Sequence, residues 1–399
     1  MGQRSGQYLQ RAGALDSRLK PRICIVAQNA YGPLKGLRTG HIGGVEIQTA
    51  AFAKWLVQQG YEVSFVTWRE GEDGDECIDG VRVLKMCAAR AGFAGLRFLH
   101  PRLSSFIAAL ARANADVYYH NCAEYYTGII AAWCAARRRV FVYSTASDAD
   151  CRMDRPSWQS RHGWTLYRYG LRRTTRVLVQ TRTQLRLLEL EYGLKGVHVP
   201  MPAALASPTS GTAIAKSGRS PIVLWVGRLD RRKRPTYLFD IAQEMPTTTF
   251  RIVAPTNERD PYERDVRARA ETIANIQWLG RVERHRMGDV YEDADCLCCT
   301  SQYEGFPNTF LEAWSYGIPI VSSFDPDQLI VERRLGVHAD TVREFVDGIT
   351  RMTLRLDERQ TASENALRYY TENHSAHVAL PRLEAALLEA WSSPFRHAD

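Results

Sequence analysis

Short apolar runs alternate with longer stretches of helical periodicity in the first part of the chain. The runs at 22–28, 61–68, 115–120, 138–145 and 176–181 are rich in β-branched and aromatic residues and are bounded by polar positions. Between the first two runs, GGVEIQTAAFAKWLVQQG at 43–60 places its apolar residues at helical spacing and ends at a glycine. Strands separated by helices predict βαβ units and a parallel sheet.

The pattern stops near residue 200 and then starts again. The stretch 201–220 is small, polar and rich in Pro, Ser and Gly, which is typical of a linker. A second series follows, with strands expected at 221–227, 250–255, 276–280, 295–301 and 318–323, a helix through 237–245, and a helical tail from about 361 to 391. A chain of 399 residues also exceeds the size of one core.

These patterns predict an α/β protein with two Rossmann-like, doubly wound parallel-sheet domains that face a central cleft. The expected boundaries are a loose tail at 1–20, a first domain at 21–200, the linker at 201–220, a second domain at 221–375, and a C-terminal helix within 376–399. We expect that helix to pack back on the first domain.

Composition narrows the class of protein. The chain is 45% hydrophobic and 24% charged, as in ordinary globular proteins, and no apolar run approaches the length of a membrane span. The N-terminal segment has no apolar stretch of the signal-peptide kind. The nine cysteines are scattered and odd in number, which favours a reducing compartment over a disulfide framework. We therefore expect a cytoplasmic location.

The net charge of +8 is unevenly distributed. Residues 1–200 hold 28 Lys and Arg against 16 Asp and Glu, whereas the remainder is slightly acidic. This asymmetry predicts that the first domain meets an anionic partner, such as nucleic acid, a membrane surface or a phosphorylated substrate.

Three short segments stand where strands of the predicted sheets end. Gly43 and Gly44 open the first long helix, where exposed backbone N–H groups attract phosphate; a tight turn is the simpler interpretation. Arg228 and Lys233 follow the strand at 221–227, where two cations can neutralise a diphosphate without a metal.

The third segment is EGFPNTFLE. Glu304 is expected in a loop at the end of a strand, and Glu312 in the following helix, with Asn308 or Thr309 as its cap. Two carboxylates at this spacing can accept hydrogen bonds from the hydroxyls of one polar ligand.

In this order, the segments resemble the retaining GT-B glycosyltransferases, specifically glycosyltransferase family 4. The resemblance covers about 22–375 and rests on E-x7-E at Glu304 and Glu312, on Arg228 with Lys233, and on the Gly-Gly loop.

The resemblance implies a role for each matching residue. Arg228 and Lys233 would hold the donor diphosphate, Glu304 the hydroxyls of the donor sugar, and Glu312 the ribose. Gly43 and Gly44 would contact the phosphate. The remaining implied donor contacts are Gly280, Arg281, Val282, Gly305, Phe306, Pro307, Asn308 and Thr309.

The resemblance also implies a mechanism that retains anomeric configuration by front-face attack, with the departing phosphate taking the acceptor's proton and no metal or other cofactor. Similar enzymes often carry a histidine at the end of a first-domain strand, which matches His120, although Asn121 could occupy that place. Asp148 and Asp150 either face the acceptor or are plain loop residues.

Other signals are weaker. Three pairs fit the D-x-D pattern of metal-binding aspartates: Asp148 with Asp150, Asp293 with Asp295, and Asp325 with Asp327. Cys296 and Cys299 have the spacing of half a zinc site, but we interpret them as buried thiols of the core. The basic, aromatic segment 158–176 fits either contact with anionic membrane or an ordinary helix packed on the sheet. No recognised motif supports nucleic-acid binding.

The expected function is therefore transfer of a sugar from a UDP- or GDP-linked donor to a saccharide or lipid-linked acceptor, in polysaccharide or glycolipid synthesis. The location would be the cytoplasm, or the inner face of the membrane. The alternatives are a sugar-nucleotide epimerase on the same fold and a non-catalytic protein that binds sugar nucleotides or anions.

Overall fold

A computed structural model describes residues 20–37, 43–93, 96–157, 159–203 and 219–393. The chain divides into two compact units, the first comprising residues up to Met201 together with Leu380 onward, and the second Pro202–Ala379. The expected tail at 1–20 and linker at 201–220 lie almost entirely outside the described residues.

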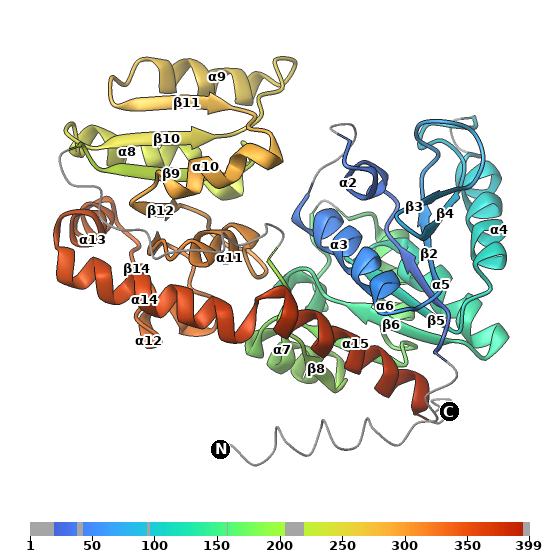
Figure 1. Ribbon diagram of the computed structural model, residues 1–399. Coiled ribbons are helices and arrows are strands. Elements are labelled where there is room, and N and C mark those ends of the chain that lie inside the picture. The colour runs from blue at the N-terminus through green and yellow to red at the C-terminus, as the bar shows by residue number, and fades with distance from the viewer. Residues whose placement is uncertain (1–19, 38–42, 94–95, 158, 204–218, 394–399) are drawn as a thin grey trace, which may run out of the picture. The chain divides into compact units, whose positions relative to one another are not determined.

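Unit 1 is built on an eight-stranded sheet with the order β3-β4-β2-β1-β5-β6-β7-β8 (Figure 1). Its strands are β1 (Ile23–Val26), β2 (Val63–Thr67), β3 (Glu76–Ile78), β4 (Val81–Lys85), β5 (Val117–Asn121), β6 (Val140–Ser144), β7 (Arg176–Val179) and β8 (Gly196–His198). Its helices are α2 (Tyr31–Lys35), α3 (Gly44–Gln58), η2 (Phe98–Leu103), α4 (Ser104–Ala113), α5 (Tyr125–Arg137), η3 (Asp148–Cys151), α6 (Arg161–Leu171), α7 (Arg182–Tyr192) and most of α15 (Ala376–Ser392).

Both faces of this sheet are buried, as a doubly wound sheet requires. Along β1, Ile23 and Ile25 point into one apolar cluster, and Cys24 and Val26 point into the other. The C-terminal helix α15 contributes Leu380, Leu383, Leu387 and Ala390, at helical spacing, to the first of these clusters.

One edge of the sheet differs from the expected all-parallel order. β3 pairs antiparallel with β4, through a hairpin whose turn is Asp79-Gly80, with φ of 47° and 79°. Asp-Gly is the dipeptide preferred for such a turn, because both central residues need positive φ. The hairpin could therefore have been read from CIDGVRV.

Unit 2 has a six-stranded parallel sheet with the order β11-β10-β9-β12-β13-β14. Its strands are β9 (Ile222–Val226), β10 (Thr249–Val253), β11 (Ile276–Gly280), β12 (Cys296–Cys299), β13 (Ile320–Ser322) and β14 (Gly336–His338). Its helical elements are η4 (Arg231–Lys233), α8 (Pro235–Glu244), α9 (Pro261–Glu271), η5 (Arg284–Arg286), α10 (Met287–Glu292), α11 (Asn308–Ser315), η6 (Pro326–Gln328), α12 (Leu329–Glu332), α13 (Val342–Leu354) and α14 (Leu356–Asn373).

This sheet is also covered on both faces. Val223 and Trp225 of β9 belong to one apolar cluster, and Leu224 belongs to the other. The carboxyl ends of β9 and β12 lie next to each other in the sheet, which brings the loops after both strands to one edge, where ligands of open α/β sheets bind.

Candidate active site

The turn after β9 is stabilised by its own charged residues. Asp230 accepts a hydrogen bond from the backbone N–H of Arg232 (2.9 Å) and two from its guanidinium, through Nε (3.0 Å) and Nη2 (2.5 Å). These contacts lower the pKa of Asp230 to about 2. The turn is therefore rigid before any ligand arrives.

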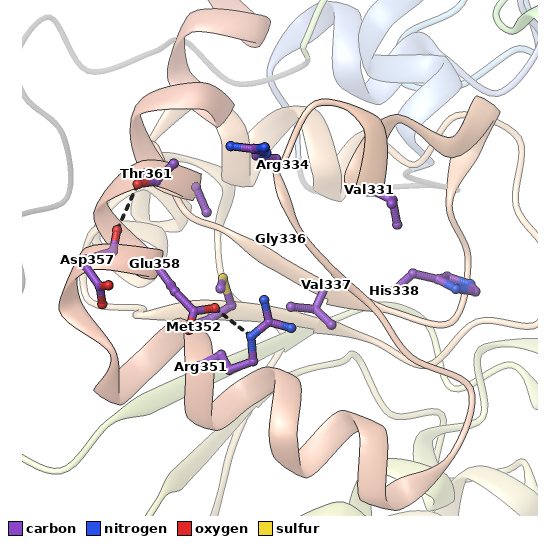
Figure 2. A pocket seen from close by; sticks show the side chains of 11 residues that line it. Val331, Arg334, Gly336, Val337, His338, Arg351, Met352, Asp357, Glu358 and Thr361 are labelled. Atoms are coloured by element: carbon purple, nitrogen blue, oxygen red, sulfur yellow. Dashed lines mark hydrogen bonds and ion pairs between the residues drawn. The ribbon is translucent and has the colours of Figure 1, made fainter.

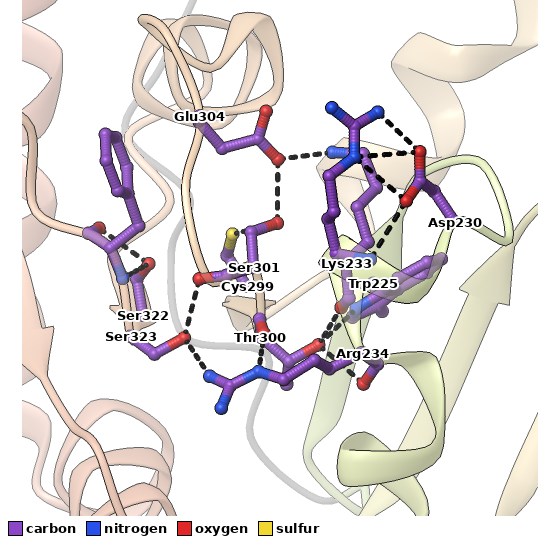
Figure 3. Close-up of polar contacts among 12 residues, drawn as sticks. Trp225, Asp230, Lys233, Arg234, Cys299, Thr300, Ser301, Glu304, Ser322 and Ser323 are labelled. Carbon is purple, nitrogen blue, oxygen red and sulfur yellow. Dashed lines mark hydrogen bonds and ion pairs between the residues drawn. The ribbon is translucent and has the colours of Figure 1, made fainter. Parts of the chain in front are cut away.

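Arg234 ties this turn to the neighbouring strand ends. Its guanidinium donates to the carbonyl of Thr300 (2.7 Å) and to Oγ of Ser323 (2.8 Å) (Figure 3). The Thr300 hydroxyl in turn donates to the carbonyl of Lys233 (2.6 Å). Lys233 is thus held through its backbone carbonyl, and the next residue, Arg234, through its guanidinium.

The side chain of Lys233 passes directly over Gly227. A Cβ at Gly227 would lie 2.9 Å from Lys233 Cδ and 3.1 Å from Trp225 Cη2. Only glycine leaves room for the lysine stem there, so the strand end and the lysine are matched to each other.

Lys233 and Glu304 form an ion pair at the edge of the sheet. Lys233 Nζ donates to Glu304 Oε1 at 2.6 Å, and Ser301 Oγ donates to the same oxygen at 2.7 Å (Figure 3). Their side chains are 23% and 20% exposed. The pair is held in place yet accessible, and Lys233 keeps further N–H donors for an anion.

Glu312 lies in a different environment. It is buried in α11, where its Oε2 accepts a hydrogen bond from the Tyr291 hydroxyl (2.8 Å) and its Oε1 lies 3.6 Å from Nη1 of Arg284. Burial raises the pKa of the Glu312 carboxyl. The motif's two carboxylates therefore have separate partners rather than a common one.

Arg284 and Tyr291 were not singled out by the sequence. The basic run RVERHR after β11 is the signal that could have suggested Arg284. The cap prediction for α11 was wrong, because its N-cap is Pro307, without a side-chain hydrogen bond. The fixed φ of proline is what orients the chain there.

The other predicted donor contacts lie at the end of β11, in the loops after β11 and β12, and at the start of α11. Gly280 is the last residue of β11, where a Cβ would have no described neighbour within 4 Å, and Val282 is a partly buried residue packed against a core cluster. Phe306 is buried, with its ring 5.0 Å from that of His374. Arg281, Gly305 and Pro307 lie in the loops that follow β11 and β12, while Asn308 and Thr309 begin α11.

In unit 1, Gly43 is the N-cap of α3 and Gly44 its first residue. His120 and Asn121 end β5, and both are buried. Nδ1 of His120 is 2.8 Å from the carbonyl of Val26, and burial lowers the pKa of the ring to about 4, so that the ring is neutral at neutral pH.

One aspartate of each D-x-D pair makes contacts within the fold. Asp150 accepts from the backbone N–H of Ala146 (2.7 Å), Asp295 is held by Arg219 and Arg359 at 2.8 Å each, and Asp325 accepts from the N–H of Ile330 (2.8 Å). Cys296 and Cys299 are buried thiols. Among the described residues, no three His, Cys, Asp or Glu side chains are grouped as metal ligands.

The segment 158–176 is mostly helix α6. Its aromatic side, Trp164 and Tyr167 with Leu171, is buried in a core cluster of unit 1, and Trp158 lies outside the described residues. Within the described ranges, no helix combines the length and apolarity needed to cross a bilayer.

A cavity of about 580 Å³ lies elsewhere in unit 2. It opens beside β14, between side chains of α12, α13 and α14, and includes Arg334, His338 and Arg351 (Figure 2). It contains none of the predicted site residues. A hollow of only about 10 Å³ lies under Lys233, lined in part by Trp225, Ser301 and Thr309.

Two family models match the chain on either side of its division. Residues 43–202 match the glycosyl transferase 4-like domain, and residues 220–354 match the glycosyl transferases group 1 domain. The chain belongs to glycosyltransferase family 4. The family's two-domain GT-B fold is also that of its structural neighbours.

Curated relatives align along most of the family-4 chain. A D-inositol 3-phosphate glycosyltransferase of Xylanimonas cellulosilytica is 24% identical over 340 residues, covering 76% of this chain and 80% of the relative. Mannosylfructose-phosphate synthase of Agrobacterium fabrum is 23% identical, covering 75% and 76%.

Solved structures share the fold at lower identity. Sucrose-phosphate synthase from Thermosynechococcus elongatus superposes with a TM-score of 0.77 at 16% identity, over 94% of this chain and all of the neighbour. Anabaena HepE in complex with UDP and glucose gives 0.71 at 15% identity, over 92% of this chain and all of the neighbour. The resemblance to GT-B glycosyltransferases is confirmed, and the chain is a glycosyltransferase.

Proposed function

We propose that this glycosyltransferase moves a sugar from a UDP- or GDP-linked donor to a saccharide or lipid-linked acceptor, with retention of configuration and without a metal. The observation that carries the proposal is the ion pair of Lys233 with Glu304, on two loops that meet at the carboxyl edge of the unit 2 sheet. A cation and a hydroxyl acceptor side by side suit the two neighbouring parts of a nucleotide-sugar, its diphosphate and its sugar.

Each residue then has a defined task. Lys233 and Arg228 neutralise the charge that develops on the leaving diphosphate. Glu304 accepts hydrogen bonds from hydroxyls of the donor sugar while Ser301 fixes its orientation. Glu312 accepts hydrogen bonds from the ribose, with Tyr291 holding its other oxygen. The loop residues Gly305–Thr309 and 280–282 line the sugar and the base.

Retention would follow from attack on the face that the phosphate leaves, with the phosphate oxygen taking the acceptor's proton. No side chain is needed as base in this scheme. His120, neutral through its low pKa, would act as an uncharged hydrogen-bonding group. Gly43 and Gly44 would offer backbone N–H groups at the start of α3.

A cytoplasmic site of action belongs to this proposal, and the nine thiols without a disulfide support it. Contact of residues 158–176 with an anionic membrane is not part of it. The aromatic residues that would enter a bilayer, Trp164 and Tyr167, are already used by the core.

The test is thermal stabilisation of the purified protein by UDP-, GDP- and ADP-sugars, with and without EDTA. We expect one base to stabilise, EDTA to change nothing, and Lys233→Ala to remove the effect. The matched control is Lys54→Ala, which removes an ion-paired lysine of unit 1. A requirement for a divalent metal would contradict the metal-free mechanism, and no response to any donor would contradict the proposed function.

A further inference from the structure

The carboxyl edge of the unit 1 sheet holds buried polar groups without partners. Gln28 follows β1, and His120 and Asn121 end β5; these side chains are 5%, 1% and 6% exposed. The amide nitrogen of Gln28, Nε2 of His120 and both amide atoms of Asn121 make no hydrogen bond within the part of the chain described. Buried polar groups are normally hydrogen-bonded, and a bound polar ligand can supply these partners.

Two carboxylates stand at the same edge. Glu46 is in the first turn of α3, and Glu124 is the N-cap residue of α5, where its side chain makes no capping hydrogen bond. Burial and the charge of Glu46 raise the pKa of Glu124 to about 7. Among the described residues, neither carboxylate has an ion pair with a base.

The pKa of Cys122, which follows β5, also reflects the negative charge at this edge. Burial raises the pKa of its thiol well above normal, and the charges of Asp150, Glu124 and Glu46 all act in the same direction. Arg102, on a neighbouring element, instead stacks on Trp68 and donates to the carbonyl of Ala89. The local field is therefore acidic, although this half of the chain is basic.

Strand geometry places Asn121 on the side of the sheet that α3 covers. Tyr119 packs edge-on against Phe52 of α3, with ring centroids 5.8 Å apart. Side chains two apart on a strand share a face, so Asn121 lies on the α3 side, one step nearer the carboxyl edge. Glu46 lies in the first turn of α3, and its carboxylate is close to Gly43, the N-cap of that helix. We call Gln28, Glu46, His120, Asn121 and Glu124 the acidic edge.

We propose that the acidic edge binds the ammonium group of a hydroxyl-rich acceptor, an amino sugar or amino alcohol, between Glu46 and Glu124. The amides of Asn121 and Gln28 would bind its neighbouring hydroxyls. This inference rests on the proposed function, because it names the acceptor class of that glycosyltransferase. A cation relieves the repulsion of two adjacent carboxylates, whereas a phosphate group would add to it.

The experiment measures binding of three matched probes to the full chain by calorimetry or ligand-observed NMR: D-glucosamine, D-glucose and D-glucose 6-phosphate. We expect glucosamine to bind about tenfold more tightly than glucose, and glucose 6-phosphate to bind weakest. High salt should reduce only the glucosamine advantage, since it screens charge.

Glu124→Gln keeps the shape and removes the charge, and should abolish the preference for glucosamine while leaving glucose binding unchanged. Glu46→Gln provides a second, independent test should the first variant unfold. The matched control is Glu62→Gln, an exposed glutamate just before β2, at the amino end of the sheet, which should retain the full preference.

Equal binding of glucosamine and glucose, tighter binding of the phosphate ester, no binding of any probe, or an unchanged preference in both Gln variants would each overturn the inference. Stabilisation by nucleotide-sugars is measured on the same samples. If that stabilisation persists and the preference is absent, only the acceptor assignment fails. If the stabilisation is absent as well, the proposed function fails with it.

Discussion

The carboxyl edges of the two sheets are built in opposite ways. In unit 2 two ion pairs are formed before any ligand binds, Lys233 with Glu304 at 2.6 Å and Asp230 with Arg232 at 2.5 Å. In unit 1, within the described residues, the acidic edge has buried polar atoms without hydrogen-bond partners and carboxylates without a paired base. The edge in unit 2 is preorganised by its own contacts, whereas polar groups at the edge in unit 1 have no partner among the described residues.

The difference follows from what each edge would meet. A diphosphate carries a strong charge, and a pre-positioned lysine stabilises it without reorganisation during the reaction. A polyol carries many weak hydrogen-bonding groups, and buried amides are the complementary surface for them. Under the proposed function, unit 2 would bind the donor and unit 1 the acceptor, and four measurements can break or sharpen that contrast.

The largest effect is expected for Lys233→Ala. It removes the cation that would neutralise the leaving diphosphate, so release of nucleotide from the preferred donor should fall on the order of 10³-fold. Steady-state kinetics would measure this, with Lys54→Ala as the matched control. Donor turnover within tenfold of wild type would show that the paired edge of unit 2 is structural only.

Glu304→Gln should reduce turnover by about 10²-fold, an effect of the size seen when one charged contact to the reacting substrate is lost. The amide still reaches Lys233 and Ser301 but accepts sugar hydroxyls less strongly. Binding of free UDP or GDP should be unchanged, because neither carries the sugar. If the nucleotide affinity falls as much as turnover does, Glu304 does not bind the sugar.

Gly227→Ala should lower turnover about tenfold, with nucleotide binding falling in parallel. The new methyl group would lie 2.9 Å from Lys233 Cδ and force the lysine off its position. Gly193→Ala would not be a suitable control. A Cβ there has open space, but the φ of 66° would strain an alanine. The better reference is the solvent-facing Ala51→Gly in α3, which should leave donor binding unchanged.

The last prediction concerns pH and unit 1. The folded-state pKa of His120 is lowered to about 4, so the unfolded chain binds more protons between about 4 and its normal value near 6.5. The stabilisation is thus present above pH 6.5 and is lost as pH falls toward 4, at up to about 1.4 kcal/mol per pH unit. Denaturant titrations at a series of pH values give the free energy of unfolding. It should change with pH more steeply in wild type than in His120→Asn, and only within that window. The same pH dependence of the unfolding free energy in both proteins would mean that the imidazole is not buried as a neutral group.

The order of the elements was largely readable from the sequence. Strands with alternate residues on two buried faces, such as Ile23 to Val26, and amphipathic helices such as 43–60 carry their period in the residue types themselves. The antiparallel hairpin at Asp79-Gly80 was equally readable but was not predicted, because β3 has only three residues and is not a buried apolar run.

The motif residues were also found, but not their partners. Lys233 and Glu304 are 71 positions apart, and Glu312 meets Tyr291 and Arg284 rather than Glu304. Periodicity records whether a residue is buried, and it does not record which side chain lies opposite across a strand end. The same limit hid the acidic edge, whose members come from the end of β1, the start of α3, and β5 with the residues after it.

The sequence by itself therefore determined the family, the two parallel-sheet units, and the loops that carry charge, since these depend on local residue patterns. Only the tertiary structure decided that one charged edge is paired and the other is not. That distinction depends on long-range contacts, which form when strands distant in sequence become neighbours in a sheet.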